Sequence, residues 1–432
     1  MTYPFGPPDL ANIFDGVDAD ALALVDGSRA WTYGELESWV QEQASHITDR
    51  FVFASDENSA ELVVSFLACQ RAGAVWVGIA PALSIEEREV LRARVLTAGE
   101  TPPELAAVAF TSGTSGEPKG VMHSQYSMLA PGLVSLDTSP TTPDERLGTP
   151  LSLCVLNMML LGPISAFLRG TTSVIMKRTW SEAFARDLAD GAVTTTFVVP
   201  TLLHDLVESE SVESLAPLRA VIVGGAGVEP DLVDRFEQKF GIRPIRRYGL
   251  TEAPTGVVTD GRPLPHVDVV EVDGELCVRA TGQGKWANSF AGALGYLDAP
   301  QATAELFRGG ILHTGDAGTV ASDGTVSVTG RLSELIVRGG ANIDPREIEA
   351  VIEAVSGVVE VAVVGLDDAR LGQVVGALVV GNGVDVEALD EHLRTTLARF
   401  KVPALIVMSD ALPRNAMGKV DRSAVRERLT LT

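Results

Sequence analysis

The stretch best suited to chemistry is a polar loop that follows a short apolar run. Residues 111–120 hold four hydroxyl side chains, three glycines and one lysine, and they come directly after the strand-like Ala107–Phe110. Glycines let backbone N–H groups approach a polyanion, hydroxyls donate to phosphate oxygens, and a lysine adds positive charge. The loop is not a Walker A loop, because Pro118 and Gly120 flank Lys119. It predicts a phosphate-binding loop of another kind.

Four later segments set acidic, basic or aromatic side chains beside glycines. They are Arg247–Glu252, His313–Asp316, Gly330–Glu334 and Pro413–Val420. Each segment alone has an ordinary structural explanation, such as a helix start, a turn or an exposed tail lysine. Together, and in this order after the phosphate loop, the segments leave little room for those explanations.

This set of motifs resembles the adenylate-forming superfamily of acyl-CoA synthetases, adenylation domains and luciferases, and it is most similar to a shortened acyl-CoA synthetase. The resemblance implies that ATP and Mg²⁺ bind and that a carboxylate is activated as its adenylate. It implies that Tyr248 stacks on adenine, that Thr251 contacts the α-phosphate and that Glu252 helps to hold Mg²⁺. One carboxylate suits a hard cation, and one aromatic face suits a base.

The same resemblance assigns the remaining site residues. It implies that Asp316 accepts hydrogen bonds from the ribose hydroxyls and that Arg331 contacts ribose and phosphate. Lys419 would bridge the incoming carboxylate and the α-phosphate, so Lys419, Glu252 and Thr251 are the predicted catalytic residues. The predicted nucleotide-binding residues are Thr111, Ser112, Gly113, Thr114, Ser115, Gly116, Lys119, Gly224, Gly225, Ala226, Tyr248, Gly249, Asp316 and Arg331, and the predicted metal ligands are Glu252 and Thr111.

The chain departs from the family pattern at three places. Only residues 82–110 separate Pro81 from Thr111, a stretch that is longer in relatives, so at least one strand-helix unit is expected to be missing. Ser333 stands where relatives usually have a hinge Asp or Lys. The aromatic-His pair of the family's substrate region is replaced by Ser152-Leu153.

The residues around that replacement suggest a substrate preference. Leu153, Val155, Met158, Met159 and Leu160 are apolar, which favours a hydrophobic acyl or aryl acid. Packing in the protein core explains the same residues equally well. No acidic residue stands where amino-acid-activating relatives bind the substrate ammonium, which argues against amino acids.

The elements that must position these residues alternate between strands and helices, which predicts a layered α/β core with parallel pairing. Short strands around glycines follow residue 261 and predict a small, mostly antiparallel β unit. The predicted strands are Ala74–Ile79, Thr172–Met176, Thr195–Val199, Ala220–Val223, Val267–Val272, Glu275–Ala280 and Val326–Thr329, and the predicted helices include Glu61–Ala72 and Leu232–Phe240.

The end of the chain is predicted to be a small α+β domain. Its helices are expected at Pro345–Val355 and Val386–Ala398, its strands at Val361–Val364 and Val374–Val380, and a final short loop follows. The prediction is thus an α/β fold with a large N-terminal domain, residues 1–331, of layered α/β subdomains plus a small β unit. A mobile α+β C-terminal domain, residues 332–432, completes it.

Composition limits the partners. The formal net charge of -23 argues against nucleic acid and against anionic membrane surfaces. The N-terminus lacks a secretory signal, and the most apolar stretch, Cys154–Phe167, is too short and too broken to insert stably in a membrane. Cys69, Cys154 and Cys277 have no metal-ligand spacing, which indicates buried thiols in a reducing cytoplasm.

The resulting prediction is a cytoplasmic AMP-forming carboxylic acid–CoA ligase that acts on a small carboxylic acid with ATP, Mg²⁺ and coenzyme A. Two alternatives stay open. The acceptor could be the phosphopantetheine of an acyl carrier protein, or the chain could be a non-catalytic nucleotide-binding homologue. The joint presence of Lys119, Glu252, Asp316, Arg331 and Lys419 argues against the second alternative.

Overall fold

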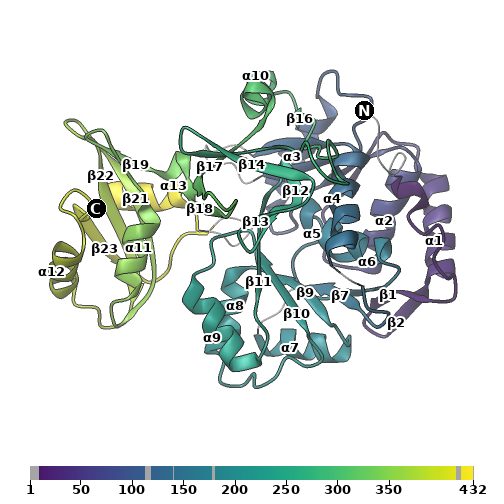
Figure 1. Ribbon diagram of the computed structural model, residues 1–432, viewed down its shortest axis with the longest axis horizontal. Helices are drawn as coiled ribbons and strands as arrows, with labels where there is room; N and C mark the ends of the chain where they lie inside the picture. Colours follow the sequence, from purple (N-terminus) through teal and green to yellow (C-terminus); the bar gives the residue numbers. More distant parts are fainter. Residues whose placement is uncertain (1–8, 112–117, 140, 178–180, 415–419, 432) are drawn as a thin grey trace.

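The computed structural model describes residues 9–111, 118–139, 141–177, 181–414 and 420–431. Figure 1 shows a large body built from the first three quarters of the chain and a smaller body beside it that contains the C-terminus. The large body holds three sheets and the small body holds one.

The largest sheet has nine strands in the order β13-β12-β11-β10-β9-β7-β8-β1-β2. Its six central strands run parallel, and antiparallel strands close both edges. The predicted strands at 172–176, 195–199 and 220–223 are confirmed within one residue. The strands are β1 (Leu22–Asp26), β2 (Arg29–Thr32), β7 (Arg146–Thr149), β8 (Thr172–Ile175), β9 (Thr195–Val198), β10 (Ala220–Gly224), β11 (Ile245–Leu250), β12 (Ala253–Thr259) and β13 (Arg262–Pro263).

The second sheet carries the predicted phosphate loop between two of its strands. Its order is β16-β6-β5-β4-β3, and β3, β4 and β5 are parallel. The described stretch from Pro81 to Thr111 contains one helix, α3 (Ile85–Leu96), and no strand between β4 and its neighbour β5. The strands are β3 (Phe51–Ala54), β4 (Val75–Gly78), β5 (Ala107–Thr111), β6 (Lys119–His123) and β16 (Gly295–Tyr296).

The third sheet is the predicted small β unit, and its pairing is antiparallel throughout. Its strands are β14 (Val267–Val272), β15 (Glu275–Ala280), β17 (Leu312–Val320) and β18 (Val326–Arg331), in that order across the sheet. Residue Arg331 ends β18, and the chain leaves the large body there.

Helices cover both faces of the nine-stranded sheet. Residues of α7, α8 and α9 pack on one face against Val174, Val198 and Val221. On the other face, Phe197 and Ile222 pack against Leu161 and Ala166. The helices of the large body are α1 (Tyr33–His46), α2 (Ala60–Arg71), α3, α4 (Gln125–Thr138), α5 (Leu156–Met159), α6 (Ser165–Leu168), α7 (Ser181–Asp190), α8 (Pro200–Glu208), α9 (Pro230–Phe240) and α10 (Pro300–Leu306), with short helical turns η1 (Leu10–Asn12), η2 (Leu160–Ile164) and η3 (Arg308–Gly310).

The small body has its own sheet and its own apolar cores. The prediction of a loop after residue 398 is wrong, because a strand and a helix follow. The helix was missed because its buried residues are only Val425 and Leu429, too few to give a clear helical pattern. The elements are η4 (Leu332–Glu334), β19 (Ile336–Arg338), β20 (Ala341–Ile343), α11 (Pro345–Glu353), β21 (Val358–Asp368), β22 (Gly372–Gly381), α12 (Val386–Thr396), β23 (Leu405–Ser409) and α13 (Arg422–Thr430).

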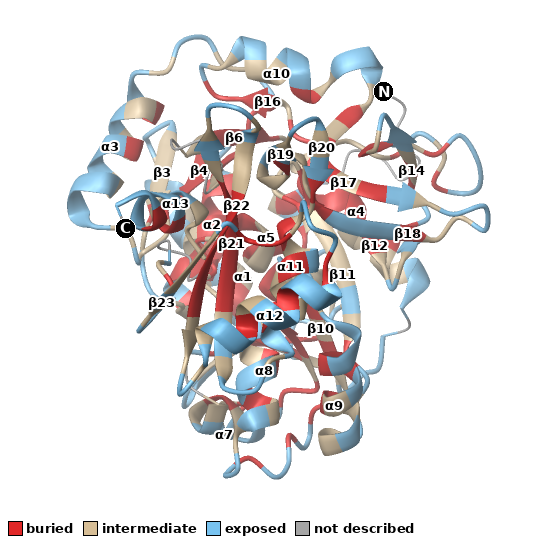
Figure 2. Cartoon of the chain, turned by 90° about the vertical axis from the view of Figure 1, so that its left-hand side faces the viewer, coloured by how far each residue is buried: buried red, intermediate tan, exposed pale blue. Residues whose placement is uncertain are grey.

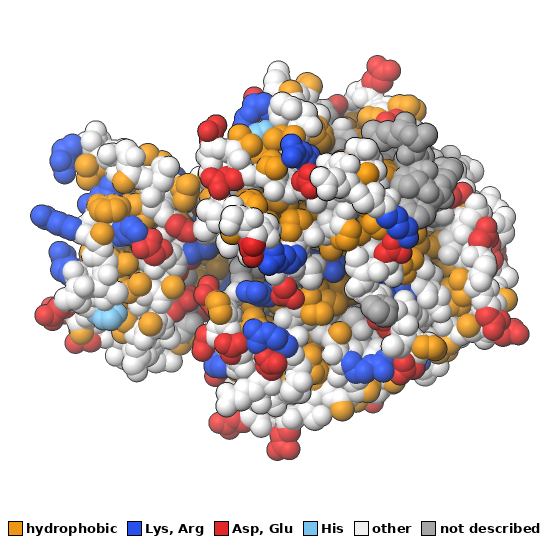
Figure 3. All heavy atoms as spheres, viewed as in Figure 1, with side chains coloured by type: hydrophobic (Ala, Val, Ile, Leu, Met, Phe, Trp, Pro, Cys, Tyr) orange, Lys and Arg blue, Asp and Glu red, His pale blue; other side chains and the backbone are white. Residues whose placement is uncertain are grey.

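Most charged side chains lie on the outside of both bodies, and Asp316 and Glu275 are buried exceptions. Figure 2 shows buried residues along the strands and mostly exposed residues on the outer helix α3. Acidic side chains are spread over the face drawn in Figure 3, with basic ones among them. None of the helices that the structure describes has the combination of length and apolarity needed to traverse a bilayer.

The closest packing near the site occurs at Gly78, the last residue of β4. A Cβ atom there would lie 2.1 Å from the Cys154 carbonyl oxygen and 2.4 Å from the Trp76 ring. We therefore expect Gly78→Ala to lower the free energy of unfolding by about 1–3 kcal/mol, measured by chemical denaturation. Gly282→Ala is the control, because no heavy atom lies within 4 Å of its Cβ position. Equal stability of both variants would contradict this packing.

Candidate active site

The predicted phosphate loop connects β5 to β6. The two strands are antiparallel, and Thr111 is the register partner of Lys119. The hairpin therefore brings the first loop residue and the lysine opposite each other. Ser112, Gly113, Thr114, Ser115 and Gly116 lie outside the described residues. The Lys119 ammonium lies 4.9 Å from the centroid of the Tyr296 ring, which is a favourable cation–π distance.

Tyr296 connects this hairpin to the predicted metal ligand Glu252. Its hydroxyl donates a hydrogen bond of 2.6 Å to Glu252 Oε1. Burial, and then the carboxylate beside it, raise the pKa of the Tyr296 hydroxyl, so it remains a donor. The strand that carries Tyr296 pairs with β6, which explains the contact with Lys119. This role was not predicted from the sequence, because Tyr296 lies in a two-residue strand far from Glu252 along the chain.

A second tyrosine holds the second carboxylate of the site. The Tyr248 hydroxyl donates a 2.6 Å hydrogen bond to Asp316 Oδ2, and Arg331 Nε lies 2.9 Å from Asp316 Oδ1. Asp316 and Arg331 are register partners on β17 and β18, so the sheet itself sets this ion pair. Burial raises the pKa of Asp316, and the Arg331 charge and the Tyr248 hydroxyl oppose that rise.

These two carboxylate pairs belong to one charged region. The charge of Glu252 contributes to the raised pKa of Asp316, and the charge of Arg331 lowers that of Tyr296. Arg346, on α11 of the small body, also lowers the pKa of Asp316. The site therefore lies where the large and small bodies meet.

The predicted glycine segment forms the rim of this region at the carboxyl end of β10. Gly225 has a φ of +83°, a backbone conformation that favours glycine, and Ala226 follows it as an exposed residue. A Cβ on Gly224 would lie 2.5 Å from the Arg247 carbonyl oxygen. Ligands of parallel α/β sheets bind at this end of the strands. Gly249 lies on the adjacent strand, beside Tyr248.

Thr251 and Glu252 form the tight turn between β11 and β12. His123 lies against the Thr251 backbone and is completely buried. Burial lowers the pKa of His123 to about 4, so its ring is neutral. Its Nδ1 lies 3.2 Å from Ser127 Oγ. His123 was not predicted from the sequence as a site residue. Its buried ring contacts the backbone of the turn that carries Thr251.

Lys419 lies outside the described residues, but both ends of its segment are described. Arg414 and Val420 form a β-bridge, and the Asp421 amide donates to the Pro413 carbonyl at 2.9 Å. The two ends of the segment therefore lie together on the small body.

Arg422, just beyond that segment, forms ion pairs with residues near the start of the small body. Its Nη1 donates to Glu349 Oε1 at 2.6 Å, and its Nε lies 3.5 Å from Glu334 Oε2. Glu334 is the residue after Ser333, the position of the family hinge. Arg422, which follows the Lys419 segment, and Glu334, which follows the hinge position, therefore belong to one ion-pair network.

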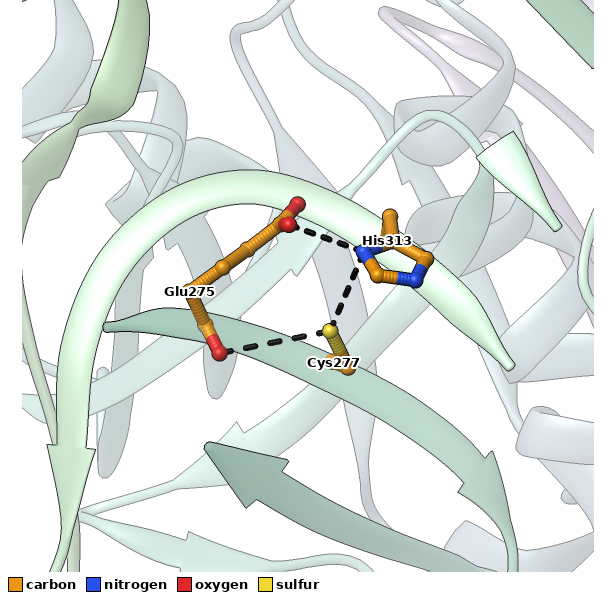
Figure 4. A group of neighbouring side chains, drawn as sticks. All are labelled: Glu275, Cys277 and His313. Carbon is orange, nitrogen blue, oxygen red and sulfur yellow. Dashed lines mark hydrogen bonds and ion pairs between the residues drawn. The ribbon is translucent and has the colours of Figure 1, made fainter. Parts of the chain in front are cut away.

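A group of three side chains supports the turn before Asp316 (Figure 4). Glu275 Oε1 accepts from the Gly315 amide at 2.8 Å, and its Oε2 lies 2.8 Å from His313 Nδ1. Cys277 Sγ lies 3.4 Å from the same ring nitrogen. Burial raises the pKa of the Cys277 thiol to about 11. Cys69, Cys154 and Cys277 are all buried and free, as predicted, but their spacing did not reveal the neighbours of Cys277.

The apolar residues proposed for the substrate region divide into two groups. Leu153, Met159 and Leu160 are buried in the main core, so packing explains them. Met158 is only partly buried against that core, and Val155 is also partly exposed. Packing in the core therefore does not fully account for these two side chains.

Comparison with known proteins agrees with this geometry. The AMP-binding enzyme family matches residues 16–95 and 92–284, and the AMP-binding enzyme C-terminal domain matches residues 347–419. A feruloyl-CoA synthase from Amycolatopsis sp is 30% identical, with 94% of this chain and 96% of the relative covered.

Two solved structures show the same arrangement. ATP-bound MatB from Rhodopseudomonas palustris is 26% identical, with a TM-score of 0.85 over 97% of this chain and 98% of the other. The apo form of that protein has a TM-score of 0.71, so this chain is more similar to the ATP-bound form. The amide bond synthetase McbA from Marinactinospora thermotolerans is 26% identical, with a TM-score of 0.84 over 97% of this chain and 99% of the other.

The family match extends over well more than half of the sequence, and the feruloyl-CoA synthase is related over nearly the whole of both chains. The protein therefore belongs to the AMP-binding enzyme family.

Proposed function

We propose that the protein is an AMP-forming carboxylic acid–CoA ligase. A carboxylate oxygen attacks the α-phosphorus of ATP, the bond to pyrophosphate breaks, and an acyl-adenylate forms. The sulfur of coenzyme A then attacks the acyl carbon, AMP leaves, and the thiol proton is released. The observation that carries this proposal is the pair of tyrosine-held carboxylates, Glu252 and Asp316, set between Lys119 and Arg331 where the two bodies meet.

The Asp316 pair fits the nucleoside part of ATP. A buried carboxylate offers two acceptor oxygens to the ribose hydroxyls, and the hydroxyl of Tyr248 fixes its direction. Tyr248 is on β11, next to β10, whose carboxyl end leads into Gly225 and Ala226. The Tyr248 ring and these small residues would accommodate a planar base. Arg331 adds a charge for ribose or phosphate oxygens.

The β5–β6 hairpin and the turn between β11 and β12 carry the residues that we propose bind the phosphates and the metal ion. Lys119 and the loop residues 112–116 would hold the β- and γ-phosphates, and Thr251 would contact the α-phosphate. Glu252 Oε1 is occupied by Tyr296, whereas Oε2 accepts no hydrogen bond from a described residue. That oxygen and the Thr111 hydroxyl are hard donors that suit Mg²⁺. The cation would neutralise charge on the phosphates during attack.

Coenzyme A is the acceptor that the relationship to a feruloyl-CoA synthase favours. The domain boundary between Arg331 and Leu332 belongs to the same proposal, because the small body would rotate there to admit the thiol. A carrier-protein acceptor is less favoured, since the net charge of -23 opposes docking of an acidic partner. The similarity to an amide bond synthetase makes amine acceptors a necessary control.

Acid-dependent ATP–pyrophosphate exchange, followed by an assay of thioester formation, tests the proposal. Exchange with at least one carboxylic acid and consumption of coenzyme A are expected. Exchange that leads to product only with an amine or a carrier protein would contradict the proposal that coenzyme A is the acyl acceptor. No exchange with any acid would indicate the non-catalytic alternative. The acyl or aryl character of the acid and the cytoplasmic location remain predictions.

Replacement of Lys419 separates the two half-reactions. Lys419→Ala removes the charge proposed to sit between two anions, so we expect ATP–pyrophosphate exchange to fall on the order of 10²–10³-fold. Thioester formation from synthetic acyl-adenylate should continue at a similar rate. Lys401→Ala is the control, because its ammonium pairs with Glu347 and lies over the Phe400 ring, both on the small body. Equal exchange by Lys419→Ala and the wild type would contradict the role.

Replacement of Asp316 separates binding from stability. Asp316→Asn loses charged hydrogen bonds to ribose, so we expect the KM for ATP to rise about 10–10²-fold. The pKa of Asp316 is raised in the folded protein, so its ionised form opposes folding above that pKa. The variant should therefore unfold at a higher temperature at pH 7.5, measured by calorimetry.

Asp323→Asn is the matched control in the same sheet. Hydrogen bonds from Thr325, and then the Arg262 guanidinium, lower the pKa of Asp323 to about 2, so its ionised form favours folding at neutral pH. We expect this variant to lower the unfolding temperature and to leave the KM for ATP unchanged. A fall in unfolding temperature for Asp316→Asn as well would contradict the account of its burial.

A further inference from the structure

Arg247 is a largely buried cationic group for which the described part of the chain offers no hydrogen-bond or ion-pair partner. Its Nε is inaccessible to solvent and has no hydrogen-bond partner, and it forms no ion pair with any residue that the structure describes. Burial lowers the pKa of its guanidinium, the charge of Arg169 lowers it further, and the charge of Asp260 opposes that fall. An arginine nevertheless stays charged in proteins, and an unpaired buried charge is costly. A bound anion would therefore stabilise the guanidinium of Arg247.

Arg246 on the same strand and Arg243 just before it show that the lack of a partner is specific to Arg247. Arg246 Nε lies 3.4 Å from Asp260 Oδ1, and Arg243 pairs with Asp234 and Glu237. Those arginines are exposed and lie next to carboxylates. Arg247, the one directed inward, has no carboxylate within hydrogen-bond distance among the described residues.

The direction of Arg247 follows from strand geometry. Successive residues of a strand point to opposite faces, and Tyr248 points to Asp316. Arg247 therefore points to the face that Ile222 and Phe197 occupy, where they pack against Leu161. The side chain is therefore on the face opposite to that of Tyr248, and the charges of Arg169 and Asp260 act on its guanidinium.

Gly256, within the neighbouring strand β12, leaves room for the arginine stem. A Cβ atom on Gly256 would lie 2.7 Å from Arg247 Cγ and 2.8 Å from its Cδ. The residue before it, Thr255, has a φ of +65°, which is a strained conformation for a β-branched residue. Thr259 Oγ1, on the register partner of Arg247, is also buried without a hydrogen-bond partner. Two polar groups on the same cross-strand pair thus lack a partner.

This pair of polar groups belongs to the hairpin that carries Thr251 and Glu252. We propose that the acid substrate has a second carboxylate, which Arg247 binds, so that the enzyme activates one end of a dicarboxylic acid. This inference rests on the proposed function. Arginine suits this task because its planar fork can donate two parallel hydrogen bonds to a carboxylate. Ile222, Phe197 and Leu161 suit an apolar body between the two carboxylates, in agreement with a hydrophobic acyl or aryl acid.

Matched pairs of acids test this proposal. Each pair consists of a dicarboxylic acid, such as glutarate, adipate or terephthalate, and its monomethyl ester, which has almost the same shape and one charge fewer. ATP–pyrophosphate exchange by the wild type should show a kcat/KM at least about 10²-fold higher for the best diacid than for its ester. Arg247→Met should abolish this preference by slowing exchange with the diacid and leaving exchange with the ester similar.

Arg246→Met is the matched control, because it removes an exposed arginine from the opposite face of the same strand. It should keep the preference for the diacid. The unfolding temperature of Arg247→Met should be unchanged or higher, since the variant removes an unpaired charge. A lower unfolding temperature with an equal loss of exchange for diacid and ester would assign Arg247 a structural role and overturn the proposal.

The outcomes also distinguish this proposal from the function on which it rests. Wild-type exchange that is equal for each diacid and its ester, or faster for monocarboxylic acids, overturns the role of Arg247 and leaves carboxylate activation intact. Absence of exchange with every acid overturns both.

Discussion

The buried carboxylate of Asp316 joins the parts of the large body that form the site. It accepts a hydrogen bond from Tyr248 of the nine-stranded sheet and pairs with Arg331 of the four-stranded sheet. Glu275 holds the Gly315 amide directly before it. The four-stranded sheet cannot shift against the larger sheet without breaking these bonds. Because Arg331 is the last residue of β18, the same interaction also lies beside the boundary proposed between the two bodies.

The small body reaches back to this point through its own charges. Arg346 on α11 influences the pKa of Asp316, and a Cβ on Gly227 would lie 3.8 Å from Arg346 Nη1. Arg422 connects the end of the Lys419 segment to Glu334, beside the hinge position. The residues proposed for adenylation therefore come from two bodies that a short connection joins. An enzyme that must exchange pyrophosphate for a thiol at one site can use such a connection to change what the site admits.

The sequence predicted the parts of this site that depend on local motifs, and it missed those that depend on long-range contacts. Tyr248, Glu252 and Asp316 stand in recognisable segments, but the strands that carry Tyr248 and Asp316, β11 and β17, were not predicted. Tyr296 could not be found, because only the pairing of β16 with β6 brings it to Glu252. Arg247 was visible within a motif, but its lack of a partner depends on every side chain around it.

The central claim is that a carboxylate oxygen attacks the α-phosphorus of ATP. An acid that supports exchange, labelled with ¹⁸O in the reacting carboxylate, tests it directly when AMP and pyrophosphate are analysed by mass spectrometry after turnover with coenzyme A. The account predicts one ¹⁸O atom in AMP and none in pyrophosphate. Label in pyrophosphate or phosphate, or AMP that forms without label, would contradict it.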